Sequence, residues 1–126
     1  MNENEISRHI LNASIEVHRT LGGPGLLESV YEEALAWELR ESGFEVRRQY
    51  EVPIIYKQNT LGNSLRIDLL INEKVIIECK ATARFNDIFE AQTLTYLRRM
   101  NLRLDLAINF GERLVKEGFH CFVNGL

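Results

Sequence analysis

The stretch LRIDLLINEKVIIECKA, residues 65–81, decides the fold of this chain because it holds two apolar runs separated by three polar residues. Each run has the length and the β-branched composition of a buried strand. The polar residues between them, 72–74, are few enough for a hairpin connection. We therefore predict two antiparallel strands, at about 65–71 and 75–81.

Three charged residues interrupt these runs, namely Asp68, Glu78 and Lys80. A charge inside an apolar strand costs free energy unless it is paired or binds a metal. Residues i and i+2 of a strand point to the same face, so Glu78 and Lys80 are neighbours. If all three connecting residues form the loop, Ile71 pairs with Val75, and Asp68 then lies opposite Glu78 with Cβ atoms roughly 5 Å apart. A two-residue loop would shift this register by one residue.

Two carboxylates that face each other repel unless a cation lies between them. Carboxylate oxygens together with water suit Mg²⁺, or Mn²⁺ in its place. Such an ion would activate a water molecule and offset the charge of a phosphate, while Lys80 would hold that water or the transition-state oxyanion. The backbone carbonyl of Cys79 lies between the two side chains and is a further candidate ligand. The alternative is a buried structural salt bridge between Lys80 and Asp68 or Glu78, which so short a pattern also fits.

Helices and further strands are predicted on both sides of this hairpin. Apolar residues recur at three- and four-residue steps over about 3–21 and again over about 26–42, which predicts two helices separated by the glycine-rich break at 22–25. We further predict a cap at Gly43, a strand at 44–57 with an edge or bulge at Pro53, a turn at 58–64, a helix at 86–100 capped by Asn86 or Asp87, and strands at 104–110 and 119–123. The order α-α-β-β-β-α-β-β predicts an α/β fold with a mixed β-sheet flanked by helices.

Length and composition indicate one globular domain, 1–126, because 126 residues with 45% apolar side chains can bury a core without disulfides. The polar, acidic start of the chain and the absence of a long apolar run predict a cytoplasmic protein with no membrane segment. Two separate cysteines and three scattered histidines argue against a structural zinc site.

The net charge of −3 gives no support to nucleic-acid binding by itself. Two local groups of basic residues fit either a nucleic-acid stripe or a solvated surface: Arg47, Arg48 and Lys57, and Arg84, Arg98, Arg99 and Arg103.

Three further polar residues share a helical face with a neighbour. Glu28 precedes Tyr31 by three residues, so it is either a partner of the charged strands or a residue of the first helical turn. Gln92 and Tyr96 are four residues apart, so they either reach a substrate phosphate or form an ordinary polar flank.

Taken together, these motifs resemble those of a known family. The segment GLLESVY, 25–31, resembles the signature of the GxxExxY proteins, and Ile67-Asp68 followed by Glu78-Cys79-Lys80 resembles the core of the PD-(D/E)xK nuclease superfamily. Residues 92–96, QTLTY, resemble the QxxxY element of RecB-type nucleases, and 106–111, LAINFG, the late strand of the family. Phe89 stands where the family pattern has a polar residue, and Cys121 where it has an arginine.

The resemblance implies a restriction-endonuclease-like fold and a magnesium-dependent phosphodiesterase site. It implies that Asp68 and Glu78 are metal ligands, that Lys80 is the catalytic lysine, and that Glu28 is an acidic residue supplied to the metal site by an N-terminal helix. It also implies substrate contacts; these would be made by Gln92, Tyr96 and Tyr31. The substrate would be DNA or another nucleic acid.

Two other readings stay open. A catalytically silent module could bind nucleic acid on the same fold, or the chain could be a partner-binding subunit. Because no recognition domain is appended, a protein partner or self-association could supply specificity.

Overall fold

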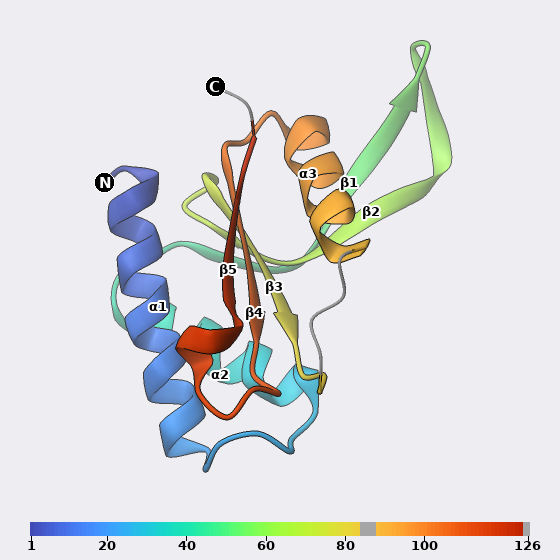
Figure 1. Cartoon of the computed structure of the whole chain (residues 1–126). Coiled ribbons are helices and arrows are strands. Elements are labelled where there is room, and N and C mark those ends of the chain that lie inside the picture. Colours follow the sequence, from blue (N-terminus) through green and yellow to red (C-terminus); the bar gives the residue numbers. More distant parts are fainter. Residues whose placement is uncertain (84–87, 125–126) are drawn as a thin grey trace.

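The computed structural model describes residues 1–83 and 88–124, in which a twisted sheet lies between two layers of helices (Figure 1). The elements are α1 (Glu3–Thr20), α2 (Glu28–Glu41), β1 (Val46–Tyr56), β2 (Asn59–Ile71), β3 (Val75–Lys80), α3 (Ile88–Met100), β4 (Leu104–Asn109), the 3₁₀ turn η1 (Val115–Gly118) and β5 (Phe119–Val123). The predicted α/β class and element order are confirmed. The predicted helix caps Asn86 and Asp87, and Arg84, lie outside the described residues.

The sheet has the strand order β1-β2-β3-β4-β5. Only the β3–β4 pair is parallel, and the long crossover between these two strands contains α3. In the β2–β3 hairpin, Ile71 pairs with Val75 and Leu69 with Ile77. The predicted three-residue connection is therefore confirmed, and the pairing extends as far as Leu69 and Ile77, next to Asp68 and Glu78.

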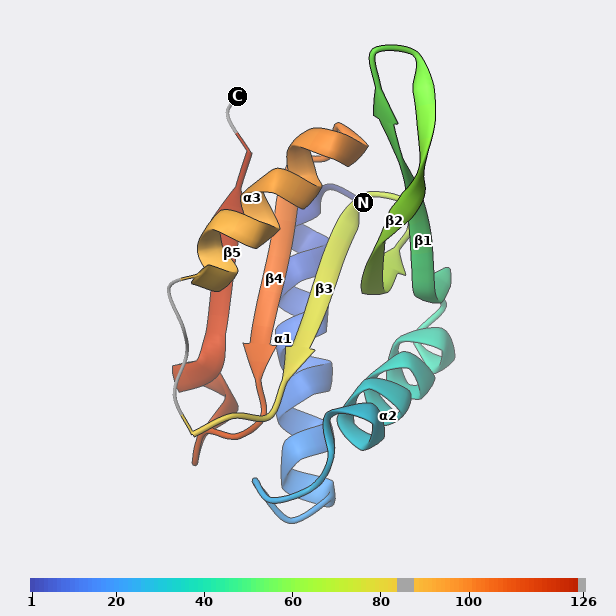
Figure 2. The ribbon, with the colours of Figure 1, turned by 90° about the vertical axis from the view of Figure 1, so that its right-hand side faces the viewer.

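The predicted turn at 58–64 is wrong. Strand β2 already begins at Asn59, and the turn consists of Lys57 and Gln58, both with positive φ (47° and 70°). The polar, glycine-containing stretch after them was expected to be irregular, yet it pairs with β1 in an arm that projects beyond the rest of the sheet (Figure 2). Pro53 lies on the edge strand β1, where the register shifts between Pro53 and Ile55, as its position predicted.

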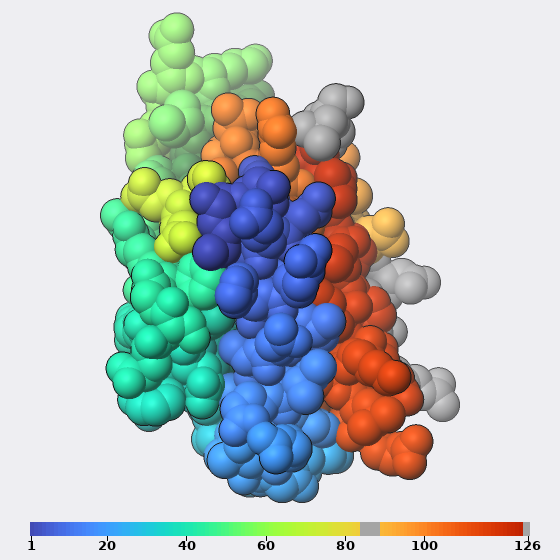
Figure 3. Space-filling view, turned by 90° about the vertical axis from the view of Figure 1, so that its left-hand side faces the viewer, coloured from blue at the N-terminus to red at the C-terminus, as the bar shows by residue number. Residues whose placement is uncertain are grey.

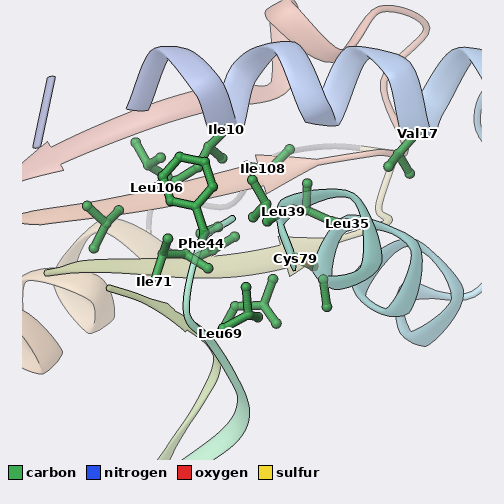
Figure 4. Packing of buried hydrophobic residues seen from close by; sticks show 14 of the residues in the cluster. Ile10, Val17, Leu35, Leu39, Phe44, Leu69, Ile71, Cys79, Leu106 and Ile108 are labelled. Atoms are coloured by element: carbon green, nitrogen blue, oxygen red, sulfur yellow. The ribbon is translucent and has the colours of Figure 1, made fainter. Parts of the chain in front are cut away.

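Helices α1 and α2 cover one face of the sheet, and α3 covers the other (Figures 1 and 2). The larger core lies under α1 and α2, where Ile10, Leu35 and Leu39 pack against Leu69, Ile71, Cys79, Leu106 and Ile108 of the sheet (Figure 4). The smaller core lies under α3 and contains Ile67, Leu70, Ile76 and Leu97. Alternate residues of β3 serve different cores, since Ile77 and Cys79 lie in the larger core and Ile76 in the smaller one. In β2 this alternation is interrupted near Asp68, because Ile67 and Leu70, three residues apart, belong to the same core.

Helix α2 ends as its sequence predicts. Gly43 has a φ of +91°, and its N–H donates to the Arg40 carbonyl while the Phe44 N–H donates to the Leu39 carbonyl. This pair of bonds turns the chain from the helix into β1. In the part of the chain that the structure describes, no helix is both long enough and apolar enough to cross a membrane.

Candidate functional site

Glu78 and Lys80 lie on the face of the sheet that α3 covers, and Asp68 lies next to them. Leu70 and Ile76 pair with each other and belong to the core under α3. Glu78 and Lys80 are two and four residues after Ile76, so both share that face. Asp68 is placed beside them by its contacts, since its Oδ2 atom accepts from the Cys79 N–H and its charge raises the pKa of Glu78. Figure 2 shows this face, with α3 lying over the strands.

The two carboxyl groups are in direct contact. Asp68 acts on Glu78 both by its charge and through a side-chain hydrogen bond. The Oδ2 atom of Asp68 accepts a hydrogen bond from the Cys79 N–H at 2.8 Å. The backbone between Glu78 and Lys80 is thus held against the Asp68 carboxylate.

Glu78 is buried, and its Oε1 atom has no hydrogen-bond partner among the described residues. Burial raises the pKa of Glu78 to about 9, and the nearby carboxylates of Asp68 and Asp105 add to this rise, while Lys80 opposes it. The carboxyl group is therefore protonated at neutral pH unless a cation offsets the surrounding negative charge.

Asp105, on β4, is an acidic residue of this patch that the sequence analysis missed. It pairs with Ile76 in the parallel ladder, is fully buried, and has no described hydrogen-bond partner at either carboxyl oxygen. Burial raises its pKa to about 8, with Asp68 adding to the rise. The signal was available, because Asp105 interrupts the apolar run 104–110 just as Asp68 interrupts 65–71.

Lys80 is half-buried, and its Nζ atom lies 4.5 Å from the centre of the Phe89 ring on α3. This is a cation–π contact, which holds the ammonium group over the acidic patch. Among the described residues, Lys80 forms no salt bridge with Asp68 or Glu78, so the alternative of a structural ion pair is not what the structure shows. Phe89, which departs from the family pattern, is the residue that positions this lysine.

Helix α2 brings two further carboxylates to the edge of the site. Glu28, at its first turn, accepts a hydrogen bond from the Ala81 N–H at 3.3 Å, so it lies next to the end of β3. Glu32, one turn later, is buried and accepts hydrogen bonds from Arg48 and from Gln49. Burial is the largest cause that raises the pKa of Glu32, followed by the charge of Asp68.

Gln49 links α2 to the acidic patch. Its Nε2 atom donates to Glu32 at 2.7 Å and lies 3.4 Å from Asp68 Oδ1. Gln49 has a φ of +49° within β1, which re-aims its side chain, as is common at irregular strand positions beside active sites. Neither Glu32 nor Gln49 was predicted, because both act through contacts between elements that are distant in the sequence.

Gln92 and Tyr96 lie on α3 and bind each other, since Gln92 Nε2 donates to the Tyr96 hydroxyl at 2.9 Å. Gln92 is exposed and Tyr96 is half-buried. Burial raises the pKa of Tyr96, and the charge of Glu78 raises it further, so the Tyr96 hydroxyl lies within electrostatic range of the acidic patch. The structure therefore brings this pair to the border of the site.

Tyr31 is not brought to the site. Its side chain is fully buried and stacks on Phe110, with ring centres 4.7 Å apart. Its hydroxyl donates to the Gly23 carbonyl and accepts from the Leu26 N–H, which ties down the glycine-rich connection between α1 and α2. The predicted substrate contact is corrected to a structural role, because no side-chain atom is left to meet a ligand.

The segment that follows β3 is clamped to the end of β4. Asn109 accepts from the N–H groups of Thr82 and Gly111 and donates to the Thr82 carbonyl. A Cβ atom on Gly111 would lie 2.2 Å from the Thr82 carbonyl oxygen, so this close approach requires glycine. Together with the bond from Phe110 N–H to the Lys80 carbonyl, this clamp fixes the backbone that carries Lys80.

Arg47 and Arg48, from the first group of basic residues, form ion pairs with acidic neighbours and so do not form a free basic stripe. Arg47 pairs with Glu45 and Glu73, and Arg48 with Glu32, so these two cations are neutralised by neighbours.

Cys121 pairs with Leu106, which faces the α1 core, so it lies on the opposite side of the sheet from the acidic patch.

The donor set fits a hard divalent cation with several retained waters. Asp68 lies beside Glu78, and Glu78 has a buried oxygen that no described protein group satisfies. Within residues 1–83 and 88–124, no group of three His, Cys, Asp or Glu side chains is arranged as a metal cluster.

Comparison with known proteins agrees with this geometry. Residues 4–122 of the chain match the family model of the PD-(D/E)XK nuclease superfamily. No curated protein and no solved structure gives a match. The mixed sheet, the element order and this match are those of a restriction-endonuclease-like fold. The chain belongs to the PD-(D/E)XK nuclease superfamily.

Proposed function

We propose that this protein is a divalent-metal-dependent nuclease that hydrolyses phosphodiester bonds in DNA. The observation that carries the proposal is the convergence of Asp68, Glu78 and Lys80 beneath α3, with a buried Glu78 oxygen that lacks a partner. A carboxyl pair that cannot ionise together becomes fully ionised when a cation binds between its members. The segment 25–31 further supports placing the chain in the GxxExxY group.

In this proposal Asp68, Glu78 and the Cys79 carbonyl hold Mg²⁺ or Mn²⁺, with Glu28 reaching the same site from α2. The bound ion supplies positive charge against the phosphate and lowers the pKa of a water molecule. Asp68 also orients the Cys79 backbone through its Oδ2 atom, so one residue places two of the ligands.

Lys80 supplies the second positive charge of the site. Its ammonium group is held by the Phe89 ring and is not consumed by a salt bridge with a described carboxylate, so it remains available to a phosphate oxygen. Gln92 and Tyr96 lie at the border of the patch, where they would orient the substrate. The polar groups of the site thus have distinct tasks: binding the ion, neutralising phosphate charge and positioning the strand.

The acidic patch disfavours a silent binding module. The charge of Asp68 raises the pKa of both Glu78 and Asp105, and burial raises these two pKa values strongly. Such a patch repels a polyanion unless it holds a cation. A module that only bound nucleic acid would gain nothing from it.

The test is cleavage of plasmid and linear DNA with Mg²⁺, Mn²⁺ or EDTA. We expect activity with either metal, and a loss of about 100-fold or more in Asp68→Asn and in Lys80→Met. Glu73→Gln and Lys74→Met are matched controls, because both residues are exposed in the 72–74 turn. Activity that persists in EDTA, or in Lys80→Met, would contradict the proposal.

Metal binding gives a second readout that does not depend on turnover. Because burial raises the pKa of Glu78, glutamine replaces a carboxyl group that is protonated in the metal-free protein, and we expect Glu78→Gln to keep its fold. We expect Mn²⁺ binding, followed by electron paramagnetic resonance, to be lost in Glu78→Gln and retained in Lys80→Met. Equal Mn²⁺ binding by wild type and Glu78→Gln would remove the carboxyl pair from the metal site.

A further inference from the structure

A second concave region lies beside the C-terminal end of α1, away from the acidic patch. It is a groove of about 600 Å³ between this end of α1 and the segment 113–116. Figure 3 shows the same face, where the lower half of α1 lies next to the residues that follow β4. The volume lies within the range of pockets that accommodate small organic molecules and exceeds the need of a single ion.

The groove combines an apolar floor with a cationic rim. Ile15, Leu114 and Val115 are apolar, whereas the charged residues that line it are Arg19, Arg113 and Lys116. None of its described lining residues is acidic, although the whole chain has more Asp and Glu (18) than Lys and Arg (15). The charge of the groove is therefore opposite to that of the protein as a whole.

Two of the three rim cations are unpaired. Arg113 and Lys116 are exposed, and neither forms a salt bridge with a residue that the structure describes. Arg19 pairs with Glu16 and is partly neutralised. Unpaired cations above an apolar floor suit a ligand that has an anionic group attached to a flat, weakly polar body.

The walls of the groove are held in place by the protein itself. The His18 Nε2 atom lies 3.0 Å from the Glu112 carbonyl, which joins α1 to the segment after β4. On the other side, the Tyr31 hydroxyl donates to the Gly23 carbonyl at 2.7 Å. The groove is therefore preformed, which lowers the ordering cost of binding.

The same loops connect the groove to the candidate catalytic site. Arg113 is two residues after Gly111, which packs against Thr82, and Phe110 bonds to the Lys80 carbonyl. Groove and site thus lie at one end of the sheet, where the parallel strands β3 and β4 finish.

We propose that this groove binds an unpaired nucleotide of the nucleic-acid strand, with its phosphate between Arg113 and Lys116 and its base on the apolar floor. The inference rests on the proposed function, since it assigns the substrate class of the same protein. Bases in a duplex are stacked inward and could not use an apolar floor, whereas unpaired bases can. The groove therefore selects strands that are single-stranded or locally unpaired.

The test measures binding by the full chain in EDTA, so that no cleavage is needed. The probe is a fluorescein-labelled 20-nucleotide DNA, as single strand or duplex, titrated at several NaCl concentrations from 50 to 200 mM. We expect tighter binding of the single strand. In the double variant Arg113→Ala/Lys116→Ala, the slope of log K against log salt should become shallower by about 0.7, for the loss of the one phosphate contact that the two cations share on a single strand.

The matched control is Arg8→Ala/Lys74→Ala, which removes two exposed cations that lie outside the groove. It should bind as wild type does. Three results would overturn the inference: the groove variant binds like wild type, the duplex binds as tightly as the single strand, or deoxyadenosine monophosphate binds as tightly as the 20-mer.

The two proposals can fail separately. Groove-dependent binding of the single strand, together with no cleavage in Mg²⁺ or Mn²⁺, would support the groove and contradict the nuclease. Metal-dependent cleavage whose strand binding is unaffected by Arg113→Ala/Lys116→Ala would support the nuclease and overturn the groove.

Discussion

Replacing Asp105 with asparagine tests whether the acidic patch beneath α3 is protonated in the folded, metal-free protein. Asp105 is fully buried, and neither carboxyl oxygen has a described hydrogen-bond partner. Its pKa rises from 3.8 to about 8, chiefly because burial disfavours the charged form. Asparagine has nearly the same shape and cannot ionise.

The sign of the pH effect follows from these two pKa values. At a pH between these two values, Asp105 is ionised in the unfolded chain and protonated in the folded protein, so folding takes up one proton. The contribution of Asp105 to stability is therefore greatest below its unfolded pKa and falls as the pH rises toward the folded pKa. The loss is about 1.4 kcal/mol per pH unit.

The assay is urea unfolding in EDTA from pH 5.5 to 7.5. Over these two pH units, the free energy of unfolding of Asp105→Asn should rise relative to wild type by about 2.7 kcal/mol. Glu16→Gln is the control, because Arg19 lowers the pKa of Glu16, so its contribution is already complete at pH 5.5. Parallel pH profiles of Asp105→Asn and wild type would refute the reasoning, since Asp105 would then be ionised in the folded protein.

Three other changes probe the supports of the site. Tyr31→Phe removes a buried hydroxyl that makes two hydrogen bonds, so urea unfolding should show a loss of about 1–3 kcal/mol, with the cleavage rate retained at saturating substrate. Gly111→Ala places a methyl group against the Thr82 carbonyl; we expect a loss of about 1–3 kcal/mol by the same method, and unchanged stability would mean that the loop can move apart at no cost. Phe89→Leu removes the ring beneath Lys80, so cleavage should slow while Mn²⁺ binding stays the same, and a parallel loss of both would show that the ring supports the fold instead.

The central hairpin shows how much the residue pattern alone predicted. Two apolar runs and a three-residue polar connection were enough to predict the register in which Ile71 pairs with Val75. Strand alternation is a local geometric property, so it also predicted that Glu78 and Lys80 share a face. The same local reasoning predicted the helices α1 and α2 and the strands β4 and β5, because the pattern of apolar residues within each segment indicates its secondary structure.

Local patterns did not predict two features, namely the β1–β2 arm and the role of Asp105. Residues 59–64 are polar and exposed, so nothing in their own pattern required a strand, and only pairing with β1 makes them one. Asp105 carried the same signal as Asp68, but its role depends on β4 lying beside β3. That neighbour relation arises from the parallel crossover, which spans residues 81–103.

The sequence by itself determined the class of fold, the order of its elements and the carboxyl pair with its lysine, because these follow from local periodicity and from the cost of charges in apolar strands. Only the tertiary structure decided that Tyr31 is sealed against a loop, that Gln49 joins Glu32 to Asp68, and that a cationic groove lies at the end of α1. These outcomes depend on which distant surfaces meet, and the free energy of such contacts is set by the whole packed chain and not by any one segment.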